Sequence, residues 1–397
     1  MKQYTFIQLN EINFEIVGKY IKKGYHLPFL EKIILTGIDT YEDEIYENLE
    51  PWIQWFTIFK GEPYKLHGIF RLGDGLNQPG DNLFSDIRNT LKMSCGAIAP
   101  MNIPAGDIDF DFFLPDPWSN QIFKGKRGLD FIYKAIKQGV NDNSGKGLNF
   151  KNKIFLLLGL LLNLNLIDLL KALKYFLKIN GLSYRKALFL DLILTILHQR
   201  LIKRYKTQFS SVFLNAGAHI QHHYLLNSKV LSEKNKFKNP NWYINQNKDP
   251  LAEALILYDR ILNSYYKLGF EIIIMTGLQQ VPYDRAIFYY RLSNHSLFLD
   301  YLEISYVKIF TRMTRDFEII FESNIDRDIC RNKLSKIIDE NGIRVFDELD
   351  TRNKSIFCTL TYPNEILPSQ IFLNDKNKFN LFNFVNFVGI KNGQHHK

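Results

Sequence analysis

The stretch "SSVFLNAGAHIQHHY" (Ser210–Tyr224) is the one from which the fold is best predicted. Its first part is an apolar run that leads into small residues, which is typical of a buried strand followed by a loop. Its second part packs three of the chain's nine histidines, His219, His222 and His223, into five positions. Either these histidines hold a metal or a charged substrate beyond the strand, or they belong to the polar start of a helix.

Strands and helices alternate on both sides of this stretch. "YTFIQLNEIN" predicts a first strand ending at Asn10–Glu11, and "EIIIMTG" predicts a later strand. A helical pattern over Pro250–Gly269 separates the strand of the quoted stretch from this later one. Such alternation predicts an α/β/α sandwich with a mainly parallel central sheet. We expect the core to comprise 1–123 and 206–320, with a helical insertion or cap over 124–205 and a peripheral α+β segment over 321–397.

The composition is that of a globular chain with a sizeable core. Of its 397 residues, 46% are hydrophobic and 23% are charged, so disorder is not expected. The net charge of +9 would suit an anionic ligand, but a solvated basic surface is the favoured interpretation. The sequence contains no zinc-finger, helix-turn-helix or RNP signature, so nucleic acid is not an expected partner.

The three cysteines and the N-terminus bear on location. Cys95, Cys330 and Cys358 are too far apart to indicate a disulfide framework or a CxxC metal site. The opening "MKQYTFIQLNEINFE" lacks the long apolar region of a secretory signal. These observations favour a cytoplasmic location. They make no prediction about the oligomeric state.

A leucine-rich stretch raises the question of membrane contact. "IFLLLGLLLNLNLIDLLKALKYFL" (Ile154–Leu177) is interrupted by polar residues before it reaches the roughly 20 apolar residues that span a bilayer. Its second half has leucines at helical spacing. We therefore expect buried or amphipathic helices and no transmembrane segment. Peripheral contact with a membrane surface is the alternative.

Three clusters of polar residues follow predicted strands. They are Glu11, the histidines of 219–223, and "TGLQQVPYD" (Thr276–Asp284). In open α/β sheets, ligands bind beyond the carboxyl ends of the strands. We therefore expect the three clusters to contribute to one site.

Five segments together resemble the alkaline phosphatase superfamily, in the branch with type I phosphodiesterases, nucleotide pyrophosphatases and sulfatases. They are "FIQLNEINFEIV", "LPFLEKIILTG", "WFTIFKGEPYKLHGIF", "LNAGAHIQHHY" and "EIIIMTGLQQ". "LEPWIQW", "HGIFRLGD" and "PDPW" look like a bacterial alkaline phosphatase-like subgroup often associated with polysaccharide or surface-glycan loci. The resemblance implies a metal-dependent phosphodiesterase or related hydrolase, with a role in polysaccharide biosynthesis.

The departures from the superfamily pattern concern its reaction centre. Counting back ten positions from Gly61, to where a Ser, Thr or Cys nucleophile is expected, gives Pro51. Asn215 stands where a metal-binding Asp is expected, and Gly277 and Leu278 stand where an Asp-His pair is expected. We therefore do not expect the usual two-zinc centre. A water molecule or a carboxylate would replace the side-chain nucleophile.

Candidate metal ligands are assigned partly from spacing and partly from the resemblance. On a helix, His219, His222 and His223 fall on roughly one face, and His219 matches the superfamily histidine. The alternative is that one histidine faces the site, one packs in the core and one is solvated. Glu11 is a ligand or base, or else a partner for a helix N-terminus. For zinc or manganese, the predicted ligands are Glu11, Asn215, His219, His222, His223 and His295.

Candidate catalytic and substrate-binding residues come from the remaining motifs. Glu50, Asp74 and His67 are predicted to be catalytic, Glu50 as a carboxylate nucleophile or base. The alternatives are a Trp pair packed in the core and a turn closed by an Arg–Asp pair. The predicted substrate-binding residues are Trp52, Gln54, Arg71, Gln279, Gln280 and Arg291.

Two functions follow from these assignments. The first is a metal-dependent hydrolase or transferase that acts on a phosphate or sulfate ester of a glycan or nucleotide-linked precursor. The second is a catalytically inactive superfamily member that binds a glycan or anionic ligand. Loss of the nucleophile and of the Asp-His pair favours the second.

Overall fold

The first part of the quoted stretch forms a strand of a parallel sheet, as predicted, and this strand is the middle one of five. The computed structural model describes residues 2–40, 48–78, 80–119, 121, 123, 125–141, 148–231, 237–312, 315–375 and 377–396. In spatial order the strands are β3 (Phe112–Leu114), β2 (Cys95–Ile98), β4 (Phe209–Leu214), β1 (Tyr4–Leu9) and β5 (Glu271–Met275). Leu9 pairs with Leu214, and Gln8 pairs with Met275, so β4, β1 and β5 end at the same edge.

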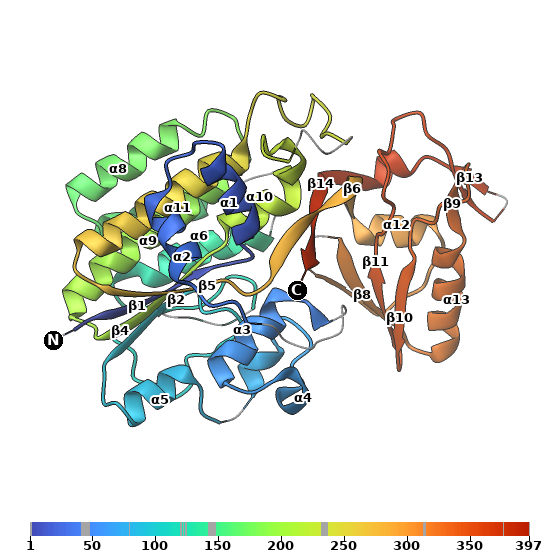
Figure 1. Cartoon of the computed structure of the whole chain (residues 1–397). Coiled ribbons are helices and arrows are strands. Elements are labelled where there is room, and N and C mark those ends of the chain that lie inside the picture. The colour runs from blue at the N-terminus through green and yellow to red at the C-terminus, as the bar shows by residue number, and fades with distance from the viewer. Residues whose placement is uncertain are drawn as a thin grey trace. The chain divides into compact units, whose positions relative to one another are not determined.

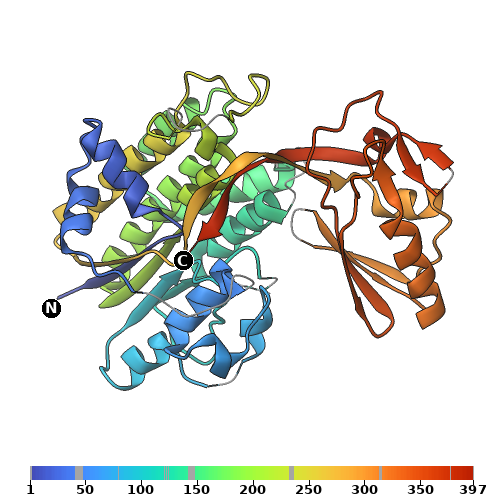
Figure 2. The ribbon, with the colours of Figure 1, turned by 45° about the vertical axis from the view of Figure 1, so that its right-hand side comes forward.

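Helices cover both faces of this sheet, which makes the unit an α/β/α sandwich (Figures 1 and 2). One face carries α3 (Pro51–Lys60), α4 (Tyr64–His67) and α5 (Leu83–Asn89). The other carries α1 (Phe14–Lys22), α2 (Pro28–Thr36), α9 (Tyr184–Tyr205), α10 (Ala216–Tyr224) and α11 (Pro250–Lys267). The predicted fold class is therefore confirmed at the level of a mixed α/β chain with a central parallel sheet.

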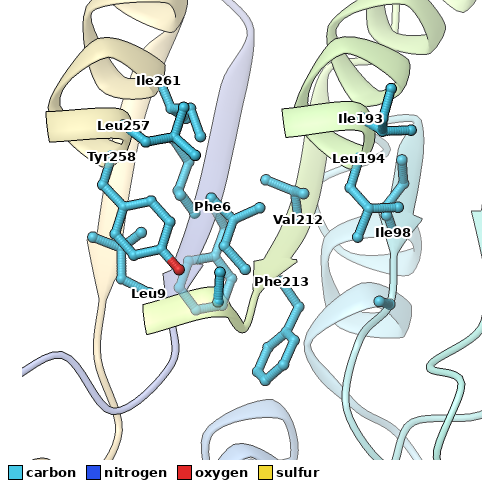
Figure 3. Packing of buried hydrophobic residues seen from close by; sticks show 14 of the residues in the cluster. Phe6, Leu9, Ile98, Ile193, Leu194, Val212, Phe213, Leu257, Tyr258 and Ile261 are labelled. Atoms are coloured by element: carbon cyan, nitrogen blue, oxygen red, sulfur yellow. The ribbon is translucent and has the colours of Figure 1, made fainter. Parts of the chain in front are cut away.

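The core explains why the quoted stretch is continuously apolar. All six residues of β4 are buried, because successive side chains enter opposite helical layers. Figure 3 shows Val212 between the buried side chains of α9 and α11, with Phe213 on the other side of the strand. There the Phe213 ring meets Trp55 of α3 edge to face, with ring centroids 5.7 Å apart. When both faces of a strand are covered, polar and apolar residues do not alternate along it.

The leucine-rich stretch forms an outer layer of helices. It comprises α7 (Phe150–Asn163) and α8 (Leu166–Leu177), which follow α6 (Leu129–Asn141) and pack on α9. α9 in turn packs on β4 and β2. Within the described part of the chain, none of the helices combines the length and the apolarity needed to cross a membrane.

A second compact unit contains Ala286–Lys391. Its sheets are antiparallel, in the orders β10-β11-β8-β7 and β13-β12-β9. It has its own core, which includes Phe317, Leu334 and Ile356. Its elements are α12 (His295–Tyr301), β7 (Lys308–Thr311), β8 (Asp316–Ile320), α13 (Asn324–Ser335), β9 (Ile337–Asp339), β10 (Glu348–Arg352), β11 (Ser355–Thr359), β12 (Phe372–Asn374) and β13 (Asn377–Phe379).

Two long strands pass between the units. β6 (Gln279–Leu292) leaves the first unit after Arg285, and β14 (Val385–His396) returns to it at Asn392. The two strands pair with each other. In the second unit β8 pairs with the later strand β11, and the end of β14 from Asn392 lies in the first unit. The predicted segment boundaries remain a prediction.

The helical block over 124–205 has two parts. α9 precedes β4 directly and covers the sheet, so it acts as a crossover helix of the α/β/α core. If the block contains an insertion, the insertion consists of α6, α7 and α8. The predicted assignment of the whole block as an insertion or cap remains a prediction.

Candidate metal centre

Glu11 is the buried carboxylate around which the candidate site is built. It follows β1 at the shared edge of the strands, and only 1% of its surface is exposed. Its φ of 57° lies in the left-handed region, which costs free energy for a residue with a side chain and persists only where the surroundings hold it. Gln221 Nε2 donates to the Glu11 carbonyl at 2.6 Å, and Asn10 Nδ2 donates to Glu11 Oε1 at 3.1 Å.

The second carboxylate oxygen of Glu11 faces three side-chain nitrogens. Gln280 Nε2 donates to Oε2, His222 Nε2 lies 3.0 Å from it, and His395 Nε2 lies 3.4 Å from it. We call Glu11, His222 and His395 the Glu11 cluster. One ligand atom from each of its residues lies within 4.8 Å of the others. Among the described residues, this is the one group of three or more such side chains that could hold a metal ion.

His222 is aimed at Glu11 by the way α10 is anchored. Asp191 of α9 accepts from the backbone N–H groups of Asn215 and Ala216 at 3.2 and 2.8 Å, which satisfies the start of α10. Tyr258 donates to the same carboxylate at 2.8 Å. At Gly217 a Cβ would lie 2.4 Å from Ile12, so the glycine allows α10 to approach the β1–α1 connection.

His395 reaches the cluster from the far end of the chain. The end of β14 belongs to the first unit and is tied there by Asn392, which is buried and exchanges two amide hydrogen bonds with Asn239 at 2.7 and 2.8 Å. Gly393 lies so close to Gln280 that a Cβ would be 2.3 Å from Gln280 Oε1. A small residue at 393 is therefore needed for the strand to bring His395 beside Glu11.

Glu50 supplies a second carboxylate on the other side of His395. It is the N-cap residue of α3, and its Oε2 lies 3.6 Å from His395 Nδ1. Its side chain is 34% exposed, in contrast to Glu11. His395 thus has one ring nitrogen toward the buried carboxylate of Glu11 and the other toward the partly exposed carboxylate of Glu50. Such an outer carboxylate orients a ligand histidine in many metal sites.

The electrostatics of the cluster favour an ionised carboxylate. Burial alone would raise the pKa of Glu11, but the charges and hydrogen bonds of His222 and His395 outweigh burial and hold this pKa well below its usual value. Burial, with a smaller effect from the charge of His222, lowers the pKa of His219 to about 4. His219 is therefore neutral at neutral pH.

The donor set of the Glu11 cluster fits a divalent transition metal. A carboxylate with two imidazoles is a ligand set of catalytic zinc sites, which keep a fourth position for water or substrate. Tetrahedral ligands at about 2.1 Å from a metal lie about 3.4 Å from one another. The distances of 3.0 and 3.4 Å from Glu11 Oε2 to the imidazole nitrogens are close to that spacing. Zinc and manganese both accept these ligand types.

The other predicted metal ligands lie elsewhere. The His219 and His223 rings are 4.8 Å apart on α10, outside the Glu11 cluster. Asn215 Oδ1 accepts from Asn10 Nδ2 at 2.8 Å, so it supports the residue beside Glu11. His295 is in the second unit, where its ring packs edge to face on Phe317. Burial, followed by the charge of Arg291, lowers the pKa of His295 to about 4.

Two of the predicted catalytic residues have local structural contacts. His67 Nδ1 accepts from the Ile69 backbone N–H at 3.0 Å, and its Nε2 lies 2.9 Å from Thr57 Oγ1. Asp74 is exposed and accepts from the backbone N–H of Arg71 at 3.1 Å. This contact closes a turn between Arg71 and Asp74, as in the structural alternative named above, but it is made by the backbone N–H of Arg71 and not by its guanidinium. Of the predicted catalytic residues, Glu50 is the one in ion-pair contact with the cluster.

The predicted binding residues are divided between the two units. Gln280 is in the cluster's shell, and Arg291 lies in the second unit. Gln279 is half-buried at the start of β6. Trp52 is half-buried on α3 and donates its indole N–H to Phe70 O at 3.1 Å.

Position 277, where the resemblance predicts an aspartate, is a glycine, and the position of Gln54 accounts for this. A Cβ at Gly277 would lie 2.9 Å from Gln54 Oε1, so Gln54 occupies the space of that side chain. Leu278, at the position of the expected histidine, is buried. The second metal-binding pair of the superfamily pattern therefore has no replacement at these two positions.

His395 and three of the residues that hold the cluster, Asn10, Asp191 and Gln221, are not among the predicted site residues, whereas Glu50 and Gln280 are. The late histidine was sought at His295, whereas the terminal "GQHHK" holds the chain's second histidine pair. That pair, at the end of a strand-like stretch, was the available signal. Asn10, Asp191 and Gln221 carried no signal, because their roles depend on contacts between residues far apart in sequence.

Comparison with known proteins leaves the family open. No protein-family model matches the chain, and no curated protein matches it. Phosphonoacetate hydrolase from Sinorhizobium meliloti 1021 in complex with phosphonoacetate is a solved structure similar to it, with TM-score 0.42 and 11% identity, covering 91% of this chain and 81% of that one. The complex with phosphonoformate gives TM-score 0.41 with the same identity and coverage. Scores this low decide neither fold nor function, so the site rests on its own geometry.

Proposed function

We propose that this protein is a metal-dependent hydrolase or transferase acting on a phosphate or sulfate ester, with Glu11, His222 and His395 as metal ligands. The observation that carries the proposal is the convergence of two imidazoles on one buried carboxylate at the carboxyl ends of parallel strands. Because burying a lone carboxylate is costly, the site must supply compensating positive charge or hydrogen bonds. A divalent cation would meet that need and explain the ligand types.

A metal held there would polarise the ester and lower the pKa of a bound water. The protein's own residues divide the remaining tasks. Asn10 and Gln280 fix the Glu11 carboxylate through one amide each. Glu50, one-third exposed at the start of α3, orients His395 and can accept a proton from the attacking water or hydroxyl. Pro51 beside it carries no nucleophile, which favours water over a side chain as the attacking group.

A narrower proposal concerns the substrate and location. The resemblance to the alkaline phosphatase-like subgroup found at polysaccharide loci supports an ester of a glycan or nucleotide-linked precursor. A cytoplasmic location belongs to the same proposal. The half-buried Trp52, Gln54 and Gln279 are the residues that we assign to substrate contact on this basis.

Metal content tests the proposal directly. The protein is purified without a His tag, and bound metals are measured by elemental mass spectrometry. We expect about one zinc or manganese per chain, lost in His222→Ala and in His395→Ala. The matched controls are His223→Ala and His396→Ala, which remove the neighbouring histidine from the same element. Wild-type protein without metal after soaking, or equal metal in all variants, would contradict the assignment.

Activity is tested on the same samples. Aryl phosphodiesters, sugar phosphates and aryl sulfates are screened before and after chelation. We expect hydrolysis that a chelator abolishes and the added metal restores. With metal in sufficient excess to keep the site loaded, Glu50→Gln should lower kcat by about a hundredfold, since a general base contributes about that much. Activity that survives chelation would exclude the metal-dependent mechanism.

A second function is favoured by the residues at the superfamily's reaction positions. Pro51, Gly277 and Leu278 provide no nucleophile and no second metal pair. The Glu11–His222 distance of 3.0 Å also suits a metal-free ion pair. On this alternative the chain binds a glycan or anionic ligand without turnover. It predicts no bound metal, together with oligosaccharide affinity that Trp52→Ala and Gln279→Ala abolish.

A further inference from the structure

The outer helices α7 and α8 expose an apolar surface that the metal centre does not use. Their exposed large side chains recur three and four residues apart, so each helix carries one continuous apolar stripe. We call this surface the 150–177 face. Its members are Phe150, Ile154, Leu157, Leu158, Leu161 and Leu162 of α7, and Leu166, Ile167, Leu170, Leu173, Phe176 and Leu177 of α8.

Unlike an ordinary surface helix, each of these helices turns an apolar stripe outward, although apolar residues such as Leu160 and Ala172 also face the protein. The side chains that face the protein include polar residues with defined partners. Asn163 donates to the Arg127 carbonyl at 2.7 Å and accepts from Arg204 at 3.1 Å. Asp168 forms an ion pair with Arg200 of α9. These contacts, together with the buried Leu160 and Ala172, fix which side of each helix faces the protein, so the leucines of the stripes face outward.

The charges around the 150–177 face are of one sign. Lys171, Lys174 and Lys178 recur along the side of the α8 stripe and are exposed, and Lys151 and Lys153 are exposed on α7. Between Leu148 and Leu182 the sequence has one carboxylate, Asp168, which is buried and pairs with Arg200 and, at 3.4 Å, with Lys171. Lysine side chains at such flanks keep their stems on apolar surface while their ammonium groups reach outward.

We propose that the 150–177 face rests on an anionic lipid bilayer, with its leucines among the acyl chains and its lysines at the headgroups. Helices of 14 and 12 residues are about 21 and 18 Å long, which suits lying in the interface and not spanning it. A second copy of the chain fits poorly, because lysines would meet lysines with no exposed carboxylate between them. An anionic membrane complements both the apolar stripe and the flanking charge.

Flotation of the full chain with vesicles tests the apolar part of the proposal. The vesicles are phosphatidylcholine alone, or equal parts phosphatidylcholine and phosphatidylglycerol. We expect flotation with the anionic vesicles, reduced about tenfold or more by the triple change Leu166→Ser, Leu170→Ser and Leu173→Ser. The control is Leu35→Ser, Leu66→Ser and Leu91→Ser, which removes leucines that are 78%, 73% and 62% exposed elsewhere, against 70%, 56% and 52% in the test set.

A second pair of variants tests the charge. Lys171→Gln, Lys174→Gln and Lys178→Gln together should abolish the preference for anionic vesicles, whereas Lys65→Gln, Lys92→Gln and Lys238→Gln should retain it. Thermal unfolding by circular dichroism verifies that every variant is folded. Wild-type protein that floats with neither vesicle overturns the proposal. So does a stable dimer in solution that the leucine variant converts to monomer, because the face would then be an interface between copies.

Discussion

At the scale of single residues, Glu11 combines three features that are seldom found together. It is almost completely buried, its backbone is left-handed, and two imidazoles approach one of its oxygens. Burial and the left-handed backbone each cost free energy, and the two imidazoles compensate for the burial of the charge. Their coincidence at the end of a central strand is typical of a residue kept for its chemistry and not for stability.

The unfolding free energy in acid should depend on whether Glu11 is ionised. Its pKa in the folded protein lies well below the ordinary 4.5, so the carboxylate stabilises the fold above that pH, and the stabilisation is lost as the pH falls through the lowered pKa. In chelator-treated protein, Glu11→Gln should lower the unfolding free energy at pH 7 by about 3 kcal/mol, the usual cost of breaking a buried pair. The deficit should shrink in acid. Urea unfolding from pH 7 to pH 3 measures this.

The matched control for this experiment is Glu15→Gln, which changes an exposed carboxylate on α1. It should leave the unfolding free energy within about 0.5 kcal/mol of wild type at each pH. A Glu11→Gln variant that follows wild type in parallel across the pH range would show that Glu11 is not held by its histidines.

At the scale of elements, the direction of α10 and the return of β14 decide which histidines meet. α10 starts on the Asp191 carboxylate, and this sets the phase with which His222, and not His219, faces Glu11. The last part of β14 lies against Gln280, and it can do so because residue 393 is a glycine. Both conditions lie outside the histidine motifs themselves.

Asp191 should show the opposite pH dependence to Glu11. Burial raises its pKa from 3.8 to about 6, against the lowering effects of its hydrogen bonds from Ala216, Tyr258 and Asn215. Its contribution to stability is therefore fully present below about pH 4 and is lost as the pH rises through 6. Relative to Asp191→Asn, the unfolding free energy of wild type should fall by about 2 kcal/mol from pH 4 to pH 7. Denaturant titration of both proteins measures it, and a constant difference would refute it.

Gly393→Ala should displace His395 without unfolding the chain. The added methyl group would meet Gln280 Oε1 at 2.3 Å and the Gln221 carbonyl at 2.8 Å, so the end of β14 must shift. We expect metal affinity to fall about tenfold to a hundredfold, as for other changes that misplace a ligand. Gly18→Ala on α1, where a Cβ meets nothing within 4 Å, is the control and should bind metal normally. Equal affinity in the two variants would argue against a ligand role for His395.

At the scale of the whole molecule, the chain has two units with separate hydrophobic cores. The Glu11 cluster belongs entirely to the first. All four tryptophans, Trp52, Trp55, Trp118 and Trp242, also belong to the first. Tryptophan fluorescence therefore reports on the unit that would bind metal, whereas circular dichroism reports on both.

Metal should stabilise the first unit selectively. At a free metal concentration of about a hundred times Kd, binding adds about 2.7 kcal/mol to the unfolding free energy. This should raise the fluorescence Tm by about 5 °C or more. A part of the circular dichroism signal should melt at an unchanged temperature. The same shift in His222→Ala would mean that the metal binds elsewhere.

The sequence by itself determined the strands, their alternation with helices and the edge at which polar residues gather. These depend on local patterns, since a buried strand must be apolar and its end must meet solvent or a ligand. It also predicted that Glu11 and the 219–223 histidines contribute to one site, and of these histidines His222 is the one that contacts Glu11. The tertiary structure alone decided that His222 faces Glu11, that His395 completes the cluster and that the leucines of α8 face outward. Helix phase, strand return and inward polar contacts are set by residues far apart in the chain, and no local spacing encodes them.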